Sequence, residues 1–559
     1  MLPEEIRKAC GAIDRHLRID YNENQFEGAA VFGLLRPWRC FVRMKRSALK
    51  DYQKQDGWIA AGYALMMLGI LAICLFLPGI LYAKKRETIP NVLLLPLGLG
   101  FVCLVYRMAK RLLGGLEKDR KKIFFLCSLG ALAVQLVMVY QYYFYTDWDV
   151  ETIVQCAMAG VTGEDISRHS TYFSMYPNNL VLVTLLSGVV RLAYALGLSQ
   201  HAYFALIVFQ GVICWLTGVL LCMIVDHLLH DDGMTGLAWM LYQLLVGCSP
   251  WISIPYSDVV ALFFPTAILA VLYLLPKTGA RGALRMFLLA FLAYFGYRIK
   301  PQIAIVLIAV VLYQLAAMVF GRPLDALRRL LKPGYVCGLA AGLCCAVLLA
   351  NAMAAKVDVE IDEELAFGIP HFLMMGMNTE EFGAYYQRDV SFSWRCATRA
   401  ERTQKNLEVF AQRVLEMGPA GLAKQLIRKT LTNFNDGTFC WAGEGVFYRE
   451  ILEEKLPVLS PLLRSIYYSH EGRLYPVWAN LAQMIWMGVL ALALCAGLHR
   501  QDGRLSVIML SVIGLTLFET LFEARARYLL CYAPLYIMLC TMGFAALKAR
   551  IAERRSSRT

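Results

Sequence analysis

The sequence is dominated by apolar runs that are long enough to cross a lipid bilayer. Each run holds about twenty residues, which as an α-helix matches the roughly 30 Å of bilayer hydrocarbon. Backbone polar groups must be satisfied inside each spanning segment, so the runs predict helices. Only 17% of the residues are charged and 58% are hydrophobic, whereas about a quarter of the residues in soluble domains are charged. We therefore predict an all-α polytopic membrane protein with about 12–13 transmembrane helices, drawn at about 58–82, 89–106, 123–145, 180–198, 202–225, 234–250, 258–275, 284–298, 302–320, 334–352, 476–498, 505–522 and 527–547.

Basic residues gather in the short links between these runs, which predicts the orientation of the chain. Lysines and arginines near the ends of spans are kept on the cytoplasmic side. The basic stretches 107–122, 277–285, 322–332 and 499–504, together with the C-terminal tail, predict that both termini are cytoplasmic in a plasma membrane. Topology thus explains the net charge of +13. We expect no nucleic-acid partner, because the sequence holds no soluble basic domain with a recognisable motif.

The two ends of the chain predict topologies that differ by one crossing. Counting forward from 107–122 places Asp258 inside, whereas counting back from the C-terminus places it outside. Four basic segments support the second count, namely 277–285, 322–332, 499–504 and the C-terminal tail. One run between residues 178 and 250 is therefore expected not to cross fully, and the candidates are 180–198, which an arginine interrupts, and 234–250, which is short.

The spans divide the chain into six predicted parts, and the last large hydrophilic one is expected to be mainly helical and extracytoplasmic. Aromatic and basic residues mixed over 31–49 are typical of a helix in the membrane interface, although a solvated basic arm fits them nearly as well. The parts are a cytoplasmic arm (1–56), two accessory helices with a basic loop (57–122), a transmembrane module (123–352) whose first external loop is 146–177, an extracytoplasmic domain (353–475), the C-terminal helices (476–547) and a basic tail (548–559).

Three acids follow the run 123–145 at alternate positions, namely Asp147, Asp149 and Glu151. Because the preceding basic stretch belongs inside, these carboxylates are predicted to emerge on the outer face, and Asp258 joins them by the count from the C-terminus. A solvated loop is the plain alternative. Ionisable groups at a membrane are costly unless paired or wet, so each one is a functional candidate.

Cations are predicted at the same face. They are Arg298 and Lys300, beside a proline, and Arg525 and Arg527, two residues apart in an apolar frame. The forked donors of arginine suit phosphate, and lysine adds a point charge. The alternative for such residues is snorkelling at the membrane boundary, which fits Arg298 and Lys300 better than the arginine pair.

Carboxylates opposite such cations can catalyse transfer of a sugar from a lipid phosphate. The leaving group is already activated, so the site needs a general base for the acceptor hydroxyl and positive charge on the departing phosphate. Alternatively, Asp147 and Asp149 hold a divalent cation such as Mg²⁺ or Mn²⁺, which prefers oxygen ligands. The residues alone leave both uses open.

The cysteines predict no zinc site, because no Cys-x-x-Cys or Cys/His spacing is present. Most of the 17 cysteines fall in apolar runs, where a thiol behaves as a small hydrophobic group. Cys396 and Cys440 lie in the hydrophilic domain, and whether they pair is not decided by their spacing.

The layout of acids, spans and long external segment resembles the GT-C superfamily of membrane glycosyltransferases. It is closest in style to bacterial relatives of protein O-mannosyltransferases and of the lipid A aminoarabinose transferase. The matching positions are Asp147 and Asp149, then Asp258 after Ser-Pro-Trp-Ile-Ser-Ile-Pro-Tyr-Ser, then the stretch Glu-Ala-Arg-Ala-Arg-Tyr-Leu-Leu that begins at Glu523. Here the acids are Asp-x-Asp rather than the adjacent Asp-Glu of many O-mannosyltransferases, which leaves a metal requirement open.

This resemblance implies a polyprenyl-phosphate sugar as donor, an extracytoplasmic glycan, lipid or protein as acceptor, and transfer with inversion. It implies Asp147 or Asp149 as general base, Glu151 and Asp258 as supporting acids, and the donor phosphate on Arg525, Arg527, Lys300 and Arg298. Acceptor contacts remain unknown, with candidates in Tyr385, Tyr386, Trp394, Trp441, Asn435 and Asp436.

Other function classes are weighed against this one. A transporter or flippase of lipid-linked substrates predicts an internal repeat, which the sequence does not show. A polymerase or ligase of lipid-linked glycans shares the large external segment and the arginines but does not need the Asp-x-Asp pair. A structural membrane scaffold needs none of these residues.

Overall fold

A computed structural model describes residues 36–77, 89–114, 119–320, 332–499 and 503–556. The chain forms two units, Met1–Asp51 and Tyr52–Thr559. The first contributes only the start of helix α2 to the described residues, and the second holds all the other elements. The side chains of the predicted interface helix at 31–49 lie outside the described residues, as does most of the predicted arm.

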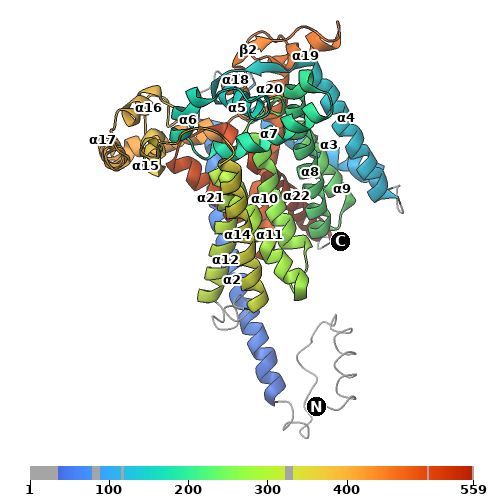
Figure 1. Cartoon of the computed structure of the whole chain (residues 1–559). Coiled ribbons are helices and arrows are strands. Elements are labelled where there is room, and N and C mark those ends of the chain that lie inside the picture. Colours follow the sequence, from blue (N-terminus) through green and yellow to red (C-terminus); the bar gives the residue numbers. More distant parts are fainter. Residues whose placement is uncertain (1–35, 78–88, 115–118, 321–331, 500–502, 557–559) are drawn as a thin grey trace, which may run out of the picture. The chain divides into compact units, whose positions relative to one another are not determined.

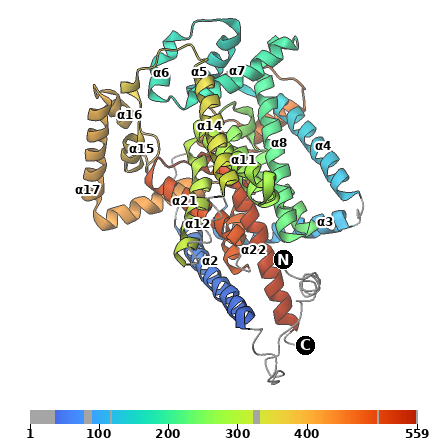
Figure 2. The same ribbon diagram turned by 60° about the horizontal axis from the view of Figure 1, so that its bottom comes forward.

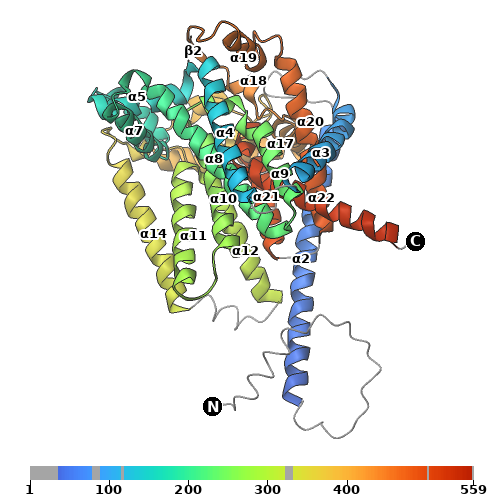
Figure 3. The same ribbon diagram turned by 90° about the vertical axis from the view of Figure 1, so that its right-hand side faces the viewer.

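Within the described residues, 11 helices are long and apolar enough to cross a membrane, which confirms the predicted all-α polytopic fold. Figure 1 shows most of them running in roughly one direction, and Figure 3 shows α10, α11, α12 and α14 side by side. They include α2 (Arg36–Phe76), α3 (Asn91–Gly114), α4 (Arg120–Tyr142), α8 (Ala202–Leu229), α10 (Ser257–Leu274), α11 (Gly279–Ile299), α12 (Ala304–Phe320), α14 (Pro333–Ala354), α20 (Tyr475–Leu494), α21 (Gly503–Leu521) and α22 (Ala533–Ser556).

The remaining elements are mostly shorter than the spans, and most of them lie outside the spans. They are β1 (Phe144–Thr146), α5 (Trp148–Thr162), α6 (Ser170–Met175), α7 (Asn179–Ala195), α9 (Asp232–Tyr242) with its π-helical continuation Gln243–Gly247, α15 (Ile369–Gly376), α16 (Gln387–Trp394), α17 (Arg399–Phe434), α18 (Trp441–Glu444), β2 (Tyr448–Ile451) and α19 (Leu459–Tyr467), with 3₁₀ turns at Ser167–His169, Ser199–His201, Pro250–Ser253, Pro301–Ile303, Glu363–Leu365, Cys495–Leu498 and Ala526–Tyr532.

Polar contacts identify one end of the bundle, which we call the basic end. Arg120, at the start of α4, pairs with Asp232 at the start of α9. Lys548, near the end of α22, pairs with Asp231 at 3.1 Å. The start of α21 joins it, because the hydroxyl of Tyr273, in the last turn of α10, donates to the carbonyl of Arg504. The opposite end of these same helices carries the candidate site.

Helix α7, not α9, is the predicted run that fails to cross. The α9 segment has 11 α-helical and five π-helical residues and leads from the basic end to Trp251, which lies at the opposite end. Both ends of α7 lie at that opposite end: Asn179 donates to Tyr172, and α8 begins just after α7 with Tyr203 packed on Tyr143. Asp149 and Asp258 therefore lie at the same end of the bundle, as the count from the C-terminus predicted.

The predicted extracytoplasmic domain is mainly helical. It joins the first loop through the antiparallel pair β1–β2, in which Phe144 lies opposite Ile451 and Tyr145 opposite Glu450. Helices α15 to α17 form a lobe beside the helix ends (Figures 1 and 2). Helix α17 bends at Gly418, where the backbone is left-handed with φ of 58°.

Close helix crossings depend on particular glycines, and one pair provides a controlled test. A Cβ on Gly98 of α3 would lie 2.2 Å from the carbonyl oxygen of Met484 in α20, whereas one on Gly100 meets nothing within 4 Å. Gly98→Ala is therefore expected to lower stability by about 1–3 kcal/mol through overpacking. Gly100→Ala should be neutral or slightly stabilising, since alanine favours helix. Thermal unfolding in detergent compares them, and equal midpoints would contradict the packing.

The two cysteines of the hydrophilic domain, Cys396 and Cys440, are free thiols. Cys396 and Cys440 are both buried and unpaired with each other, so the possible disulfide between them is not formed. The domain is instead held together by hydrogen bonds. An example is Arg402, 2% exposed, which donates to the carbonyls of Ser393, Glu364 and Cys396.

Candidate functional site

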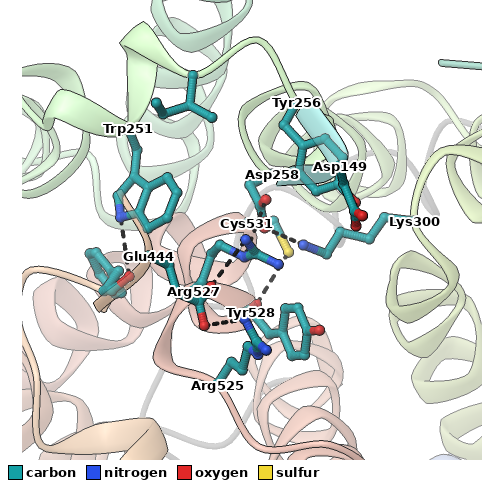
Figure 4. A network of polar contacts seen from close by, with 12 residues as sticks. Asp149, Trp251, Tyr256, Asp258, Lys300, Glu444, Arg525, Arg527, Tyr528 and Cys531 are labelled. Atoms are coloured by element: carbon teal, nitrogen blue, oxygen red, sulfur yellow. Dashed lines mark hydrogen bonds and ion pairs between the residues drawn. The ribbon is translucent and has the colours of Figure 1, made fainter. Parts of the chain in front are cut away.

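Seven charged side chains from distant parts of the chain meet at the end opposite the basic end. We call them the charged cluster: Asp149, Asp258, Lys300, Glu444, Glu523, Arg525 and Arg527. All except Asp149 are buried, with exposed fractions from 1% for Glu444 to 9% for Arg525. Buried charges carry a large desolvation cost unless they are paired. The six buried members pair with one another, and Figure 4 labels all of them except Glu523.

Asp258 is the meeting point of two cations. Lys300 Nζ binds its Oδ1, and Arg527 Nε lies 3.5 Å from its Oδ2. Figure 4 shows the two cations reaching Asp258 from different sides. The local chain explains this placement. Asp258 stands in the first turn of α10, and Lys300 is the extended residue between the end of α11 and the turn that Pro301 begins.

Glu444 is the second meeting point, and it holds both arginines. One oxygen binds Arg525 Nη1, and the other lies 3.0 Å from Arg527 Nη1. Arg525 Nε also pairs with Glu523 at 2.7 Å, and the Tyr528 hydroxyl donates to the other Glu523 oxygen at 3.1 Å. The stretch from 523 to 528 therefore supplies the two cations of the cluster, Arg525 and Arg527. It also supplies Glu523, which orients Arg525, and the hydroxyl that orients Glu523.

An aromatic box surrounds the guanidinium group of Arg527. Its carbon atom lies 4.6 Å from the ring centre of Trp148, 5.6 Å from Tyr256, 5.7 Å from Tyr528 and 5.9 Å from Trp251. Such contacts are favourable where the cation is desolvated. They fix the plane of the guanidinium group in addition to its charge, which a lysine at this position would not reproduce.

Left-handed backbone occurs beside the cluster at three residues other than glycine. Trp148 has φ of 58°, and Phe439 and Cys440, which precede the helix of Glu444, have φ of 55° and 65°. A non-glycine residue in this region costs of order 1–3 kcal/mol. At Trp148 the surroundings fix the indole, since its ring packs on Tyr256 and its Nε1 donates to Thr146. The strain thus coincides with the residues that hold Arg527 and Glu444.

Asp149 lies at the partly exposed mouth of the cluster. The Tyr256 hydroxyl donates to its Oδ2 at 3.2 Å, and the Tyr256 ring in turn packs against Arg527. Burial raises the pKa of Asp149 above its ordinary value, while the charge of Arg527 and the Tyr256 hydrogen bond act in the opposite direction. A carboxylate whose pKa lies nearer to neutral is a better proton acceptor.

Two tyrosines from other segments share the mouth with Asp149. Tyr176, in the turn before α7, and Tyr385, in the α15–α17 lobe, are both partly exposed. The guanidinium group of Arg525 lies 5.5 Å from the ring centre of Tyr385. The pKa of each phenol is raised by burial first and then by the charge of Asp149. The open side of the cluster is thus lined by aromatic rings, a carboxylate and one arginine.

Three predicted site residues lie away from this cluster. Asp147 is half-buried, and the polar contact described for it is its backbone amide donating to Phe447. Glu151, in the first turn of α5, pairs with Arg449 of β2 at 2.7 Å. Arg298 donates to the side chain of Asn351 at an exposed position. For the two acids the reason is local: helix α5 begins at Trp148, so alternate residues no longer share a face.

Sequence reasoning missed Glu444, Glu523 and Tyr256 as site residues. Glu523 and Tyr256 are each two residues away from a predicted site residue, Arg525 and Asp258 respectively. Their positions in the sequence could therefore have indicated them. Glu444 lies in a hydrophilic domain rich in acids, and nothing in its local pattern distinguishes it. Among the acceptor candidates, Trp441 and Asp436 are buried and hydrogen-bonded within the domain, and Asn435 is buried and accepts from Asn91 of α3. Tyr385, Tyr386 and Trp394 are at least partly exposed.

The residues of the cluster do not fit a divalent cation. Such an ion needs several oxygen ligands converging on one point, and among the described residues no group of three carboxylate, histidine or cysteine ligands is arranged in this way. Asp258, Glu444 and Glu523 each bind a lysine or an arginine. Asp147 and Asp149 have separate surroundings. No step of the mechanism below therefore involves a metal.

Comparison with known proteins gives the family of the chain and nothing finer. No curated protein and no solved structure matches it. Residues 56–547 match the profile of one protein family, and this match includes every residue of the charged cluster. The chain therefore belongs to the family described as conserved hypothetical integral membrane protein.

Proposed function

We propose that this integral membrane protein is an inverting glycosyltransferase that moves a sugar from a polyprenyl-phosphate donor to an extracytoplasmic acceptor. The observation that supports the proposal is the position of a partly exposed carboxylate, Asp149, over a buried group of three cations. A general base and positive charge for a phosphate leaving group are what this reaction requires.

The proposed step transfers one proton and exchanges one bond at the anomeric carbon. Asp149 accepts the proton of the acceptor hydroxyl while that oxygen forms a bond to the anomeric carbon of the sugar. The bond from this carbon to the phosphate oxygen breaks, and its electron pair leaves with the polyprenyl phosphate. Arg525 and Arg527 stabilise the charge that develops on the phosphate. Asp149 then releases its proton to water, which the mouth of the cluster admits.

The state of Arg527 supports its assignment to the phosphate. Although Arg527 is only 5% exposed, its Nε and Nη1 lie near carboxylates without making hydrogen bonds of ordinary geometry. Buried donors of this kind are rare and need an explanation. Phosphate oxygens match the fork of a guanidinium group better than two separate carboxylates do. The aromatic box keeps the fork in place while such an anion enters or leaves.

A hollow lined mostly by apolar residues supports a lipid-linked donor. It has a volume of about 540 Å³, and its lining comes from the start of α7, the end of α14 and the segment after α14, namely Leu180, Ala354, Ala355, Val357, Asp358, Val359 and Ile361. Leu180 is four residues after Tyr176, which shares the mouth with Asp149. Part of an isoprenoid chain fits such a surface, because apolar area is removed from water.

The orientation of the bundle decides on which side of the membrane the proposed reaction takes place. The basic end of the bundle carries the predicted cytoplasmic links, so the positive-inside rule assigns the charged cluster to the outer face. We propose that the reaction takes place on this outer face, where lipid-linked sugars would be used for the cell envelope.

The test is a transfer assay on the full chain in lipid nanodiscs. Synthetic polyprenyl-phosphate hexoses and pentoses are supplied as donors with a mixture of envelope lipids and glycans. Release of polyprenyl phosphate together with a glycosylated product supports the proposal. Extension of an existing lipid-linked glycan would favour a polymerase, and passage of intact donor across a vesicle membrane would favour a transporter. Either outcome, without release of polyprenyl phosphate from the simple donors, contradicts the proposal.

The pH dependence gives a further expected result. Below its pKa Asp149 is protonated and cannot accept a proton, so the rate should fall as pH is lowered through that pKa. Because burial raises the pKa, the acid limb should lie above the pH at which an ordinary aspartate titrates. Tyr256→Phe removes the hydrogen bond that favours the charged form and should move the limb to still higher pH. A limb that does not move would contradict the role of Asp149.

A further inference from the structure

The loop that leads into Arg525 is held by the α15–α17 lobe. Lys429, in the second half of α17, is 1% exposed. Its ammonium group donates to the carbonyl of Gly376 at 2.8 Å and to that of Phe522 at 2.6 Å. Phe522 stands immediately after α21 and three residues before Arg525. One side chain of the lobe therefore fixes the backbone from which both arginines extend.

Two glycines allow this close approach. A Cβ on Gly376 would lie 2.5 Å from the carbonyl oxygen of Leu521 and 2.6 Å from that of Phe522. Gly383 has φ of 84°, and a Cβ there would lie 2.6 Å from the Gly376 carbonyl oxygen and 3.0 Å from the Lys429 chain. The carbonyl of Gly383 accepts a hydrogen bond from the amide of Ala524. The backbone of the lobe thus contacts the backbone of residues 521–524 directly, without intervening side chains.

The charges around Lys429 belong to the loop and to the helix before it. They are Glu519, in the last turn of α21, and Glu523, which pairs with Arg525. Burial lowers the pKa of Lys429 to about 7, and these two acids oppose that shift. Asn433, one turn further along α17, donates to the backbone carbonyl of Glu519 at 3.5 Å. One face of α17 therefore contacts both the last turn of α21 and the loop that follows it.

We infer that Lys429 is a positioning residue that couples the α15–α17 lobe to the placement of Arg525 and Arg527. It touches neither the mouth nor the proposed substrate, and it acts through the carbonyls that it holds. A ligand that displaces the lobe would thereby displace the arginines. The effect on transfer rests on the proposed function, whereas the control of the loop does not.

The test is hydrogen exchange of the full chain in nanodiscs. Lys429→Met keeps the aliphatic chain and removes the donors, and Lys429→Gln keeps an amide donor in case the first variant does not fold. Lys424→Met, at an exposed position of the same helix, is the matched control. Amides of residues 522–528 are expected to exchange at least about 10-fold faster in Lys429→Met, and by a smaller factor in Lys429→Gln. Exchange in α20 and α22 should not change.

Two outcomes would overturn the inference. One is exchange of residues 522–528 that is equal in Lys429→Met and Lys424→Met. The other is faster exchange spread evenly over the whole chain, which would indicate a general loss of stability. If transfer is detected, the KM for the donor should rise about 10-fold in Lys429→Met while the KM for the acceptor is unchanged. Absence of transfer in all forms would reject the proposed function but leave the exchange result standing.

Discussion

Replacing Asp149 by asparagine is expected to reduce sugar transfer by about 10²–10⁴-fold, the usual contribution of a general base. The amide has nearly the shape of the carboxylate and can still accept the Tyr256 hydrogen bond, so the fold should be preserved. It cannot accept a proton at neutral pH. The loss should therefore appear in kcat, with the KM for the donor little changed.

Asp147→Asn is the matched control for this substitution. Asp147 has the same chemistry and lies two residues away, but it is not part of the charged cluster. The transfer rate of this variant should stay within about twofold of the wild type, since Asp147 is outside the charged cluster and the substitution changes neither the size nor the shape of the side chain. Mass spectrometry of the surface glycans of a strain carrying each variant gives the same comparison in cells. Equal losses in both variants, or intact glycans with normal Asp149→Asn protein levels, would contradict the assignment.

Replacing Glu444 by glutamine is expected to lower the stability of the protein by about 3–5 kcal/mol. This side chain is 1% exposed and binds both arginines. Breaking a buried pair leaves the partner charge uncompensated, and here two partners are affected at once. The midpoint of thermal unfolding in detergent should fall by several degrees, and transfer should fall with it because the arginines lose a common support.

Glu454→Gln is the control for this prediction, because Glu454 is an exposed acid of the same domain. It should leave the midpoint unchanged within error. A double substitution separates stability from function: if Arg525→Gln is combined with Glu444→Gln, the summed losses should exceed the measured loss, since the two residues are in contact. Strict additivity would show that the pair does not form.

The charge count of the cluster bears on both predictions. Four carboxylates face three cations, so the fully ionised cluster carries a formal charge of −1. Lys300, Arg525 and Arg527 are thus held by fixed acids, and only Asp149 is near solvent. A phosphate would enter an arrangement whose cations are already oriented, which reduces the ordering required on binding. The left-handed residues at Trp148, Phe439 and Cys440 are consistent with a site whose geometry is imposed by its surroundings.

The sequence by itself determined the membrane class, most of the spans and the end at which the acids gather. These follow from the length of the apolar runs and from the distribution of lysine and arginine, which are local properties of the chain. It also predicted Asp258, Lys300, Arg525 and Arg527 as members of one site, because charged residues at span ends have few alternatives to pairing.

Only the tertiary structure decided which residues meet. It separated Asp149 from Asp147, because a helix begins between them, and it sent Glu151 to Arg449 and Arg298 to Asn351. It brought Glu444 from the end of α18, about eighty residues before Arg525, which no local pattern can specify. It also showed that α7 is the run that does not cross. A pairing between distant segments depends on packing of the whole chain, whereas hydrophobic length and charge are written residue by residue.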